Sequence, residues 1–269
     1  MIQLTLIHST GSETCRNHED ITMRLMPYKL GSKSAKTLSA AMNIKRVKPD
    51  GNFRNNYNHL LLNWGCSQTP EFPTPRGIIN QPQAVAKAVN KLTSLNILRD
   101  AGVPTLTFHT TAADALSASM EGKVLYARKY LTSNSGRGIT VIQPNDEIPY
   151  APLFTEFFDK TVEYRVHATR NGVFDFQAKL KRRGSEADPY VFNYSSGRVF
   201  CRQGIELPDA VATASVDAIN ALGLDFGAVD IGVDADGNVA VFEINTACAL
   251  EGSTITSYKD ALEELINGI

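Results

Sequence analysis

Three side chains with oxygen donors lie near one another in this sequence: Asp230, Glu243 and Asn245. Because side chains alternate across a strand, Glu243 and Asn245 point to the same face if their segment is extended. Both acids are flanked by apolar residues, and a carboxylate in an apolar strand costs free energy unless a cation compensates it. Mg²⁺ prefers such oxygen ligands. The ordinary alternative is two solvated acids at a sheet edge, so the spacing alone makes this group a candidate metal site.

A β-hairpin is predicted to bring the three residues together. Residues 226–233 and 238–244 have the composition of strands, and the Asp-Ala-Asp-Gly run between them is typical of a turn. Pairing the two strands about this turn places Asp230 beside Glu243 and Asn245.

The same residues carry a family resemblance. Asp230, followed by Glu243 and Asn245, is similar to the metal-binding signature of the ATP-grasp superfamily, and the phrase EINTACALEG looks most like RimK-type ligases. The resemblance covers about residues 85–255. It implies that ATP binds together with Mg²⁺, with two ions expected, and that Mn²⁺ can substitute.

The resemblance also implies the fold. The fold class is α/β: an ATP-grasp fold, in which two α+β subdomains clamp ATP, preceded by a small N-terminal α/β pre-ATP-grasp domain. We expect the N-terminal domain at residues 1–80, the small ATP-grasp subdomain at 81–150 and the C-terminal subdomain at 151–269. Prolines between residues 66 and 82 favour a linker there, because proline fits poorly inside a helix or a central strand.

Two short motifs mark the N-terminal domain. Gly-Ser-Lys-Ser-Ala at 31–35 leads into an apolar pattern that predicts a helix over 35–42 with a serine cap. A helix N-terminus can bind an anion, but an ordinary cap is the commoner reading, and the residue order of a P-loop is absent. Together with Asn63-Trp64-Gly65, this motif resembles phage-encoded ATP-grasp proteins.

Two lysines are candidates for binding the ATP phosphates. Lys91 belongs to the phrase NKLTSLNILRDAGVP, which resembles the lead-in to ATP-grasp domains; by physical reasoning alone it is a solvated helix residue. Lys129 precedes Gly136 by seven residues and Gly138 by nine, offsets similar to those of the ATP-grasp phosphate loop. Alternation in the predicted strand points Arg128 to the opposite face. Lys129 is therefore expected to contact the α- and β-phosphates.

A loop of small residues follows that strand and includes Ser135, Gly136 and Gly138. Backbone N–H groups at the tip of such a hairpin can bind phosphate oxygens. Most loops of this composition are plain turns, so their assignment to ATP depends on the lysine spacing and on the resemblance.

An apolar segment with two acids resembles the part of ATP-grasp proteins that binds the nucleoside. Glu156, Phe157 and Phe158 would contact adenine, with the backbone reading the edge of the base. Glu163, seven residues after Glu156, would accept hydrogen bonds from the two ribose hydroxyls.

Several cations are candidates for the reacting end of the site. Arg165 shares a strand face with Glu163, and Lys179, Lys181 and Arg183 share a face of the following strand. Such rows are usually solvated, but beside a triphosphate they would neutralise charge. Arg165, Arg183 and Lys181 are the predicted catalytic residues, with the two arginines as candidates for stabilising an oxyanion.

Two positions depart from related patterns. Ala228 stands where D-alanine–D-alanine ligases carry an arginine, which argues against that activity. Cys248-Ala249 stands where RimK-type ligases usually have Pro-Gly, which leaves the shape of the acceptor pocket open.

Composition narrows the class of protein. The 269 residues are 43% hydrophobic, with a net charge of −1, which favours a large core over bulk binding to nucleic acid. The four cysteines have no metal or disulfide spacing and are typical of reduced thiols. No membrane span or signal peptide is predicted, so we expect a cytoplasmic protein.

Hydrophobic periodicity and the positions of glycine and proline predict the remaining helices and strands. Helices are expected at 83–101, from 209 to about 222 and at 257–267, the last capped by Ser257. Strands are expected at 2–8, 60–63, 123–131, 139–143, 153–157 and 174–183, and a polar loop at 184–204.

The resemblance implies an enzyme, an ATP-dependent carboxylate–amine ligase that forms an amide through an acyl phosphate and releases ADP and phosphate. Its partners would be a small-molecule, peptide or protein carboxylate and an amine acceptor. Two alternatives stay open on the same fold: an ATP-binding regulatory module, and a phosphotransferase without ligase turnover. No Ser/His/Asp or Cys/His constellation is evident, and the ligase chemistry requires no protein nucleophile.

Overall fold

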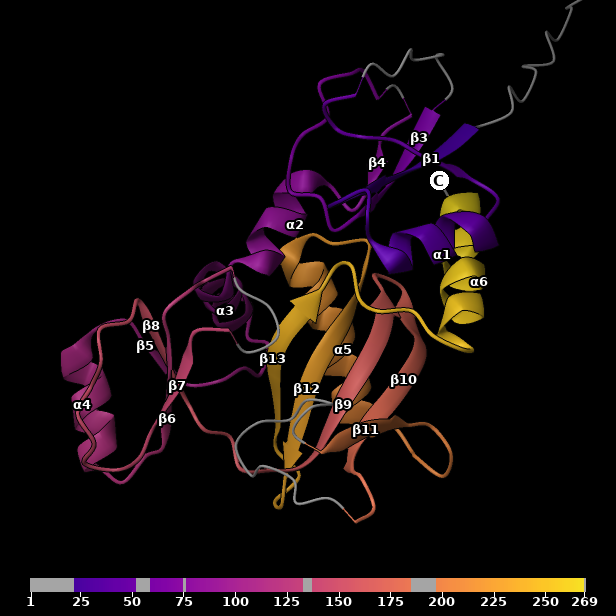
Figure 1. The fold of residues 1–269 in the computed structure, drawn as a ribbon. Helices are drawn as coiled ribbons and strands as arrows, with labels where there is room; N and C mark the ends of the chain where they lie inside the picture. The colour runs from indigo at the N-terminus through magenta and orange to yellow at the C-terminus, as the bar shows by residue number, and fades with distance from the viewer. Residues whose placement is uncertain (1–21, 52–58, 75, 133–136, 185–196, 269) are drawn as a thin grey trace, which may run out of the picture.

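The protein is described here by a computed structural model that covers residues 22–51, 59–74, 76–132, 137–184 and 197–268. Three β-sheets form three regions (Figure 1). The strand predicted at 2–8 lies outside the described residues. None of the helices in the described ranges is long and apolar enough to cross a membrane.

The N-terminal region is a parallel sheet with one helix. Strand order is β2-β1-β3-β4, and every pair is parallel. Its elements are β1 (Thr22–Pro27), α1 (Lys33–Ala41), β2 (Lys45–Arg46), β3 (His59–Trp64) and β4 (Ile78–Ile79). The Ser32 hydroxyl accepts from the Ala35 N–H at 3.2 Å, which confirms the predicted serine cap.

The predicted single helix over 83–101 is wrong, because the structure has two helices there. These are α2 (Pro82–Val89) and α3 (Lys91–Asp100). Asn90 between them is extended, and its side chain accepts from the Thr93 N–H to cap α3. The helical spacing of apolar residues continues through Asn90, so hydrophobic periodicity alone did not reveal the break.

The small sheet lies to one side of the molecule. Strand order is β5-β8-β6-β7, and all pairs are antiparallel. Its elements are β5 (Phe108–His109), α4 (Ala112–Met120), β6 (Leu125–Arg128), β7 (Ile139–Ile142) and β8 (Leu153–Glu156). The division of the chain at residues 80 and 150 remains a proposal; β8 follows residue 150 yet pairs with β5 and β6.

The third sheet carries the predicted metal ligands. Strand order is β11-β10-β9-β12-β13, and all pairs are antiparallel. Its elements are β9 (Lys160–Thr169), β10 (Gly172–Lys181), β11 (Arg198–Cys201), α5 (Asp209–Leu222), β12 (Phe226–Asp234), β13 (Val239–Asn245) and α6 (Thr254–Asn267). The predicted hairpin is confirmed: β12 and β13 are antiparallel and place Asp230 directly opposite Glu243.

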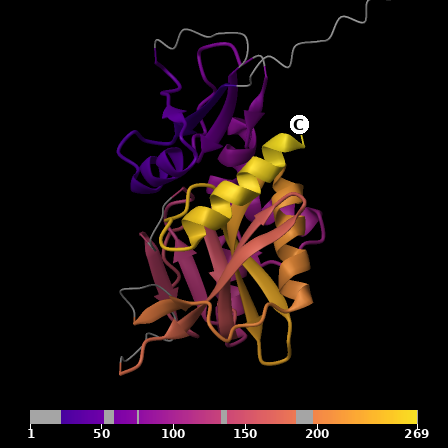
Figure 2. The same ribbon diagram turned by 90° about the vertical axis from the view of Figure 1, so that its right-hand side faces the viewer.

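Helix α6 joins the N-terminal sheet to this third sheet. Tyr258, Leu262 and Leu265 of α6 share a core with residues of β1, α1 and β3. In both views α6 runs along the border between the two regions (Figures 1 and 2). The helix begins at Thr254, three residues before the predicted start, and Ser253 at its N-cap makes no side-chain hydrogen bond. The predicted Ser257 cap is therefore wrong; its hydroxyl bonds the Ser253 carbonyl inside the helix.

Candidate functional site

One cavity of about 1270 Å³ lies where the three regions meet. A cavity of this size exceeds the volume typical of one small-molecule site, so it has room for a nucleotide and a second substrate. The predicted site residues that line it come from α3, the β8–β9 segment, β9, β12 and β13: Lys91, Glu156, Phe157, Phe158, Glu163, Arg165, Asp230, Glu243 and Asn245.

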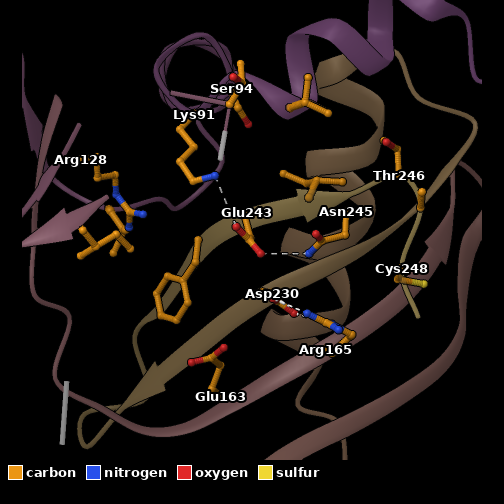
Figure 3. A pocket seen from close by; sticks show the side chains of 18 of the residues that line it. Lys91, Ser94, Arg128, Glu163, Arg165, Asp230, Glu243, Asn245, Thr246 and Cys248 are labelled. Atoms are coloured by element: carbon orange, nitrogen blue, oxygen red, sulfur yellow. Dashed lines mark hydrogen bonds and ion pairs between the residues drawn. The ribbon is translucent and has the colours of Figure 1, made fainter. Parts of the chain in front are cut away.

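A network of buried charges occupies the centre of the cavity wall (Figure 3). Arg165 makes two hydrogen bonds to the Asp230 carboxylate, Nε to Oδ1 at 2.8 Å and Nη2 to Oδ2 at 2.7 Å. Lys179 bonds Asp230 Oδ2 at 3.3 Å and also bonds Glu163. Burial alone would raise the pKa of Asp230, but Arg165 and Lys179 hold it well below its usual range.

Glu243 and Asn245 form the more open part of the candidate metal site. Asn245 Nδ2 donates to Glu243 Oε1 at 3.1 Å, and Lys91 Nζ lies 3.9 Å from Glu243 Oε2 (Figure 3). The side chain of Glu243 is 41% exposed. Among the described residues no three His, Cys, Asp or Glu side chains group as a metal site. The candidate therefore depends on the Asn245 amide oxygen as its third donor.

The donor set fits a hard cation. A carboxylate offers about four lone-pair positions, and the network uses three on Asp230, which leaves one on Oδ1. Glu243 Oε2 and Asn245 Oδ1 are carboxylate and amide oxygens of the kind that Mg²⁺ binds. Asp230, Glu243 and Asn245 are thus brought together by the structure, and their role as ligands stays a prediction.

The predicted nucleoside end of the cavity is aromatic. Phe157 packs edge-on against Tyr126 with ring centroids 6.0 Å apart, and Phe158 packs against Phe242 at 5.9 Å. Lys160, absent from the sequence-based prediction, lies 5.1 Å from the Phe242 ring centre and 3.6 Å from Glu163. Burial lowers the pKa of Lys160, and Glu163 opposes that shift. An aromatic slot that ends in buried charges suits a flat base joined to a polar sugar.

The predicted orientation of Lys129 is wrong. Lys129 is exposed, its ammonium lies 5.8 Å from the Tyr130 ring centre, and it does not line the cavity. Arg128 faces the cavity instead and donates from Nε to Thr155 at 3.2 Å. Strand β6 carries Tyr126 and Arg128 on the cavity face, so counting offsets to the glycines selected the wrong neighbour.

Burial lowers the pKa of the Lys91 ammonium, an effect that Glu243 opposes and Arg128 increases. Lys91 and Arg128, both partly buried, therefore share the single negative charge of Glu243. The positive charge left over favours an anionic ligand.

Of the other predicted nucleotide contacts, some line the cavity and some do not. Glu156 lines the cavity and accepts from His109 Nε2 at 3.0 Å. Gly138 has a φ of +77° and accepts from the Lys129 N–H, but it does not line the cavity. Ser135 and Gly136 lie outside the described residues. Their contact with phosphate stays a prediction.

The prediction that Lys181 and Arg183 face the site is wrong. Lys181 is the last residue of β10 and is exposed, and Arg183 lies beyond the strand and is also exposed. Neither lines the cavity, whereas Lys179 does and is buried. Alternation places all three cations on one face and does not separate them; the end of β10 at Lys181 does, because only Lys179 lies inside the strand. Arg165 lies in the cavity wall with the Phe200 ring 5.0 Å from its guanidinium.

The opposite end of the cavity is uncharged. It is lined by residues 65–68, which follow β3, and residues 246–249, which follow β13. Gly65 (φ +76°) approaches Ala247 so closely that a Cβ on residue 65 would lie 2.6 Å from the Ala247 Cβ. Cys248 Sγ lies 3.2 Å from the hydroxyl of buried Tyr258, which anchors the second segment to α6. Burial raises the pKa of the Cys248 thiol to about 11, so at neutral pH it is a neutral wall group.

Comparison with known proteins supports the fold. No protein-family model matches the chain, and no curated protein matches it in sequence. A solved structure of the ATP-grasp ligase PsnB with its minimal precursor has a TM-score of 0.67 at 15% identity, covering 92% of this chain and 99% of that one.

Two further solved structures are similar over nearly their whole length. The macrocyclase MdnC bound with precursor peptide MdnA, from Microcystis aeruginosa MRC, has a TM-score of 0.61 at 14% identity, covering 91% and 99% of the two chains. The D-alanine–D-alanine ligase from Bacillus anthracis has a TM-score of 0.62 at 16% identity, covering 92% and 97%. The predicted α/β ATP-grasp fold is confirmed by these similarities.

Proposed function

We propose that the protein is an ATP-dependent carboxylate–amine ligase. The observation that carries the proposal is the convergence, in one cavity, of an aromatic slot, of Lys91 and Arg128, and of the oxygen donors Asp230, Glu243 and Asn245. The first suits a base, the second the phosphates, and the third a divalent cation. The solved structures with this fold include the ligase PsnB complexed with Mg and ADP.

The reaction proposed is transfer of the terminal phosphoryl group to a carboxylate. A carboxylate oxygen attacks the γ-phosphorus, the bond to the β-phosphate oxygen breaks, and ADP leaves. An amine then attacks the acyl carbon, phosphate leaves, and an amide forms with loss of a proton. Asp230, Glu243 and Asn245 would hold Mg²⁺, with two ions expected and Mn²⁺ able to substitute, and the metal would neutralise phosphate charge.

The residues of this chain would divide the work. Arg128 and Lys91 bind phosphate oxygens, and Glu163 accepts from the ribose. Arg165 is held in the cavity wall by two hydrogen bonds to Asp230. From there its guanidinium would stabilise charge that develops on the acyl oxygen. Its donors are rigid, and rigid donors stabilise a transition state without reorganisation.

The uncharged end of the cavity favours a particular kind of acid. Its described lining, from Gly65–Gln68 and Thr246–Ala249, carries no charged side chain. A free amino acid would bring an ammonium group that finds no carboxylate there among the described residues. We infer a carboxylate carried on a peptide, and PsnB and MdnC are solved with precursor peptides.

The finer placement rests on sequence alone. The Glu243-x-Asn245 run with Glu251-Gly252 after it supports a RimK-like branch, and the motifs at 31–35 and 63–65 support a relation to phage-encoded proteins. A cytoplasmic location, favoured by the cysteine pattern, also stays a prediction.

The test is product analysis with pools of peptide acids and amines. ADP and phosphate should form in equal amounts, and hydroxylamine should trap a hydroxamate when the acid is present without its amine. Phosphate release that ignores added amine would favour a phosphotransferase. Stoichiometric AMP would exclude the proposed reaction.

Glu243→Gln is the matched control for that assay. It keeps the shape of the side chain but removes one anionic donor, so turnover should fall at least about a hundredfold. Near-normal turnover in this variant would remove Glu243 from the metal site while leaving the ligase reaction open.

A further inference from the structure

Two asparagines outside the cavity connect its uncharged end to the strand that carries Asp230. Asn63 lies in β3 and Asn80 follows β4; both are fully buried and neither lines the cavity. A buried carboxamide costs free energy unless its polar atoms are paired, so its partners identify what it holds in place.

Asn63 holds the cavity wall. Its Oδ1 accepts from the Cys66 N–H at 2.9 Å, and its Nδ2 donates to the Cys66 carbonyl at 2.8 Å. Both backbone groups of Cys66, which lines the cavity, are therefore fixed by one side chain. The second Nδ2 proton goes to the Asn80 carbonyl at 2.7 Å.

Asn80 holds the start of β12. Its Oδ1 accepts from the N–H groups of Asp225 and Phe226 at 2.7 and 3.1 Å, and its Nδ2 donates to the Phe226 carbonyl at 2.9 Å. Its own N–H donates to Asp225 Oδ2 at 2.6 Å. The backbone of Asn80 has a φ of +60°, a conformation that asparagine tolerates better than most residues.

Apolar packing also holds the N-terminal sheet against β12, but it does not fix the position of Cys66 relative to β12. Trp64 stacks on Phe226 with ring centroids 5.8 Å apart and packs edge-on against Tyr258 at 5.3 Å. Apolar burial holds surfaces together but is non-directional, so it leaves their relative register weakly defined. Hydrogen bonds in fixed directions define it.

We propose that Asn80, acting with Asn63, is a positioning residue that sets the cavity wall at Cys66 in register with β12 and so with Asp230. The acid substrate is then presented to the metal-binding residues at a fixed place. The description of that wall as the substrate end rests on the proposed function; the alignment of Cys66 with β12 does not.

The test is Asn80→Gly, with Asn43→Gly as its matched control. Glycine accepts a positive φ, so the backbone can persist while the side-chain hydrogen bonds are lost. Asn43 also has a positive φ, of 52°, and it takes no part in the hydrogen bonds that hold Cys66. Alkylation of Cys66 by iodoacetamide, followed by peptide mass spectrometry, should accelerate about tenfold or more in Asn80→Gly. Half-buried Cys201 is the internal reference and should not change.

Nucleotide binding separates positioning from general loosening. Arg128, Phe158 and Lys160 lie in other elements, so the affinity for Mg²⁺ with a non-hydrolysable ATP analogue should stay within about twofold. With a peptide acid, kcat/KM for the acid should fall about tenfold while KM for ATP is unchanged. An equal loss of analogue affinity would make Asn80 a general structural residue and overturn the proposal.

A measurement on the unaltered protein applies even if the variant does not fold. The amides of Cys66, Asn80, Asp225 and Phe226 should exchange with solvent as one unit, with protection within about tenfold of one another. Widely different protection, or Cys66 alkylation at the same rate in both variants, would overturn the alignment. Absence of ligase turnover with every acid and amine would overturn the proposed function but leave these two results standing.

Discussion

The sheet that carries Asp230 has two very different borders. On the N-terminal side, one core is shared: Leu25, Leu62 and Trp64 pack with Phe226 and Tyr258. On the other side, the small sheet keeps a core of its own, formed by α4, β6, β7, β8 and the loop before β8. It reaches β13 through a bridge between Thr105 and Val241 and a small cluster around Leu106.

This difference assigns different roles to the two ends of the cavity. The uncharged end lies at the border with the N-terminal sheet, where the core is shared. We call this the fused border, and the uncharged end should keep its shape there. The proposed nucleotide end lies at the border with the small sheet, the thin border, where a few contacts can open and close at low cost. We therefore expect the small sheet to move over bound ATP, and closure of that kind protects water-sensitive intermediates.

Removing the largest side chain of the fused border should lower the unfolding free energy more than any other change considered. Trp64→Ala leaves a cavity among Phe226 and Tyr258 and should cost about 3–5 kcal/mol of unfolding free energy. Trp64 is the only tryptophan, so the variant has no tryptophan fluorescence to follow. Urea unfolding is therefore followed by circular dichroism. Phe158→Ala at the thin border removes a half-buried ring and should cost less. Equal losses would mean that the two borders are equally fused.

Acid should weaken the fused border through His167. The ring bonds Tyr258 at 3.0 Å, and burial lowers the pKa of His167 from 6.5 to about 4. The unfolded chain therefore binds the proton first as pH falls. Stability from this group is present above pH 6.5 and declines towards pH 4, by about 3 kcal/mol in total. The unfolding free energy of His167→Asn should lose that part of the pH dependence; an unchanged profile would contradict the assignment.

At the thin border, Arg128→Ala should weaken ATP binding about ten- to a hundredfold, since a charge-assisted contact contributes roughly 1.5–3 kcal/mol. Lys129→Ala is the matched control and should change affinity little, because its side chain is exposed. Calorimetry with a non-hydrolysable analogue measures both. The reverse order would restore the sequence-based choice of Lys129 and place the phosphates outside the described cavity.

The smallest effect expected is at an ion pair on the fused border. Arg170 Nη1 lies 2.9 Å from Asp225 Oδ1, with 43% of the arginine side chain exposed. Arg170→Ala should cost no more than about 1 kcal/mol of unfolding free energy, as for other exposed pairs. A much larger loss would show that this ion pair, and not the Asn80 carboxamide, holds Asp225 in place.

The sequence was most informative where chemistry and local pattern agree. Asp230, Glu243 and Asn245 converge because a turn signal and strand alternation fix the hairpin that carries them. The orientation of Lys129 was wrong because offsets along the chain do not say which strand face a residue takes. Lys179, Lys181 and Arg183 share a face by alternation, and only the end of β10 at Lys181 separates buried Lys179 from the other two.

The two asparagines could not have been found from local pattern. Asn63 belongs to the Asn63-Trp64-Gly65 motif, but its hydrogen bonds to Cys66 and to the Asn80 carbonyl are not evident from that motif. Nothing near Asn80 sets it apart, and its side-chain partners lie about 145 residues further along the chain. Strands β1 and β11 and helix α4 were likewise not predicted. The core residues of α4 are Ala115 and Ala118, and such small side chains give a weak apolar pattern.

The core shared with α6 has a consequence for the order of folding. A ribosome makes β1, α1 and β3 long before α6, yet Tyr258 and Leu262 complete the core that buries their apolar faces. Asn80 waits in the same way for Phe226, 146 residues later. The nascent chain must therefore carry an unfinished apolar surface until α6 has been made, a state prone to aggregation. Contacts so distant in sequence also form slowly. We expect emergence of α6 from the ribosome, not emergence of the N-terminal region, to set the moment at which this shared core becomes stable.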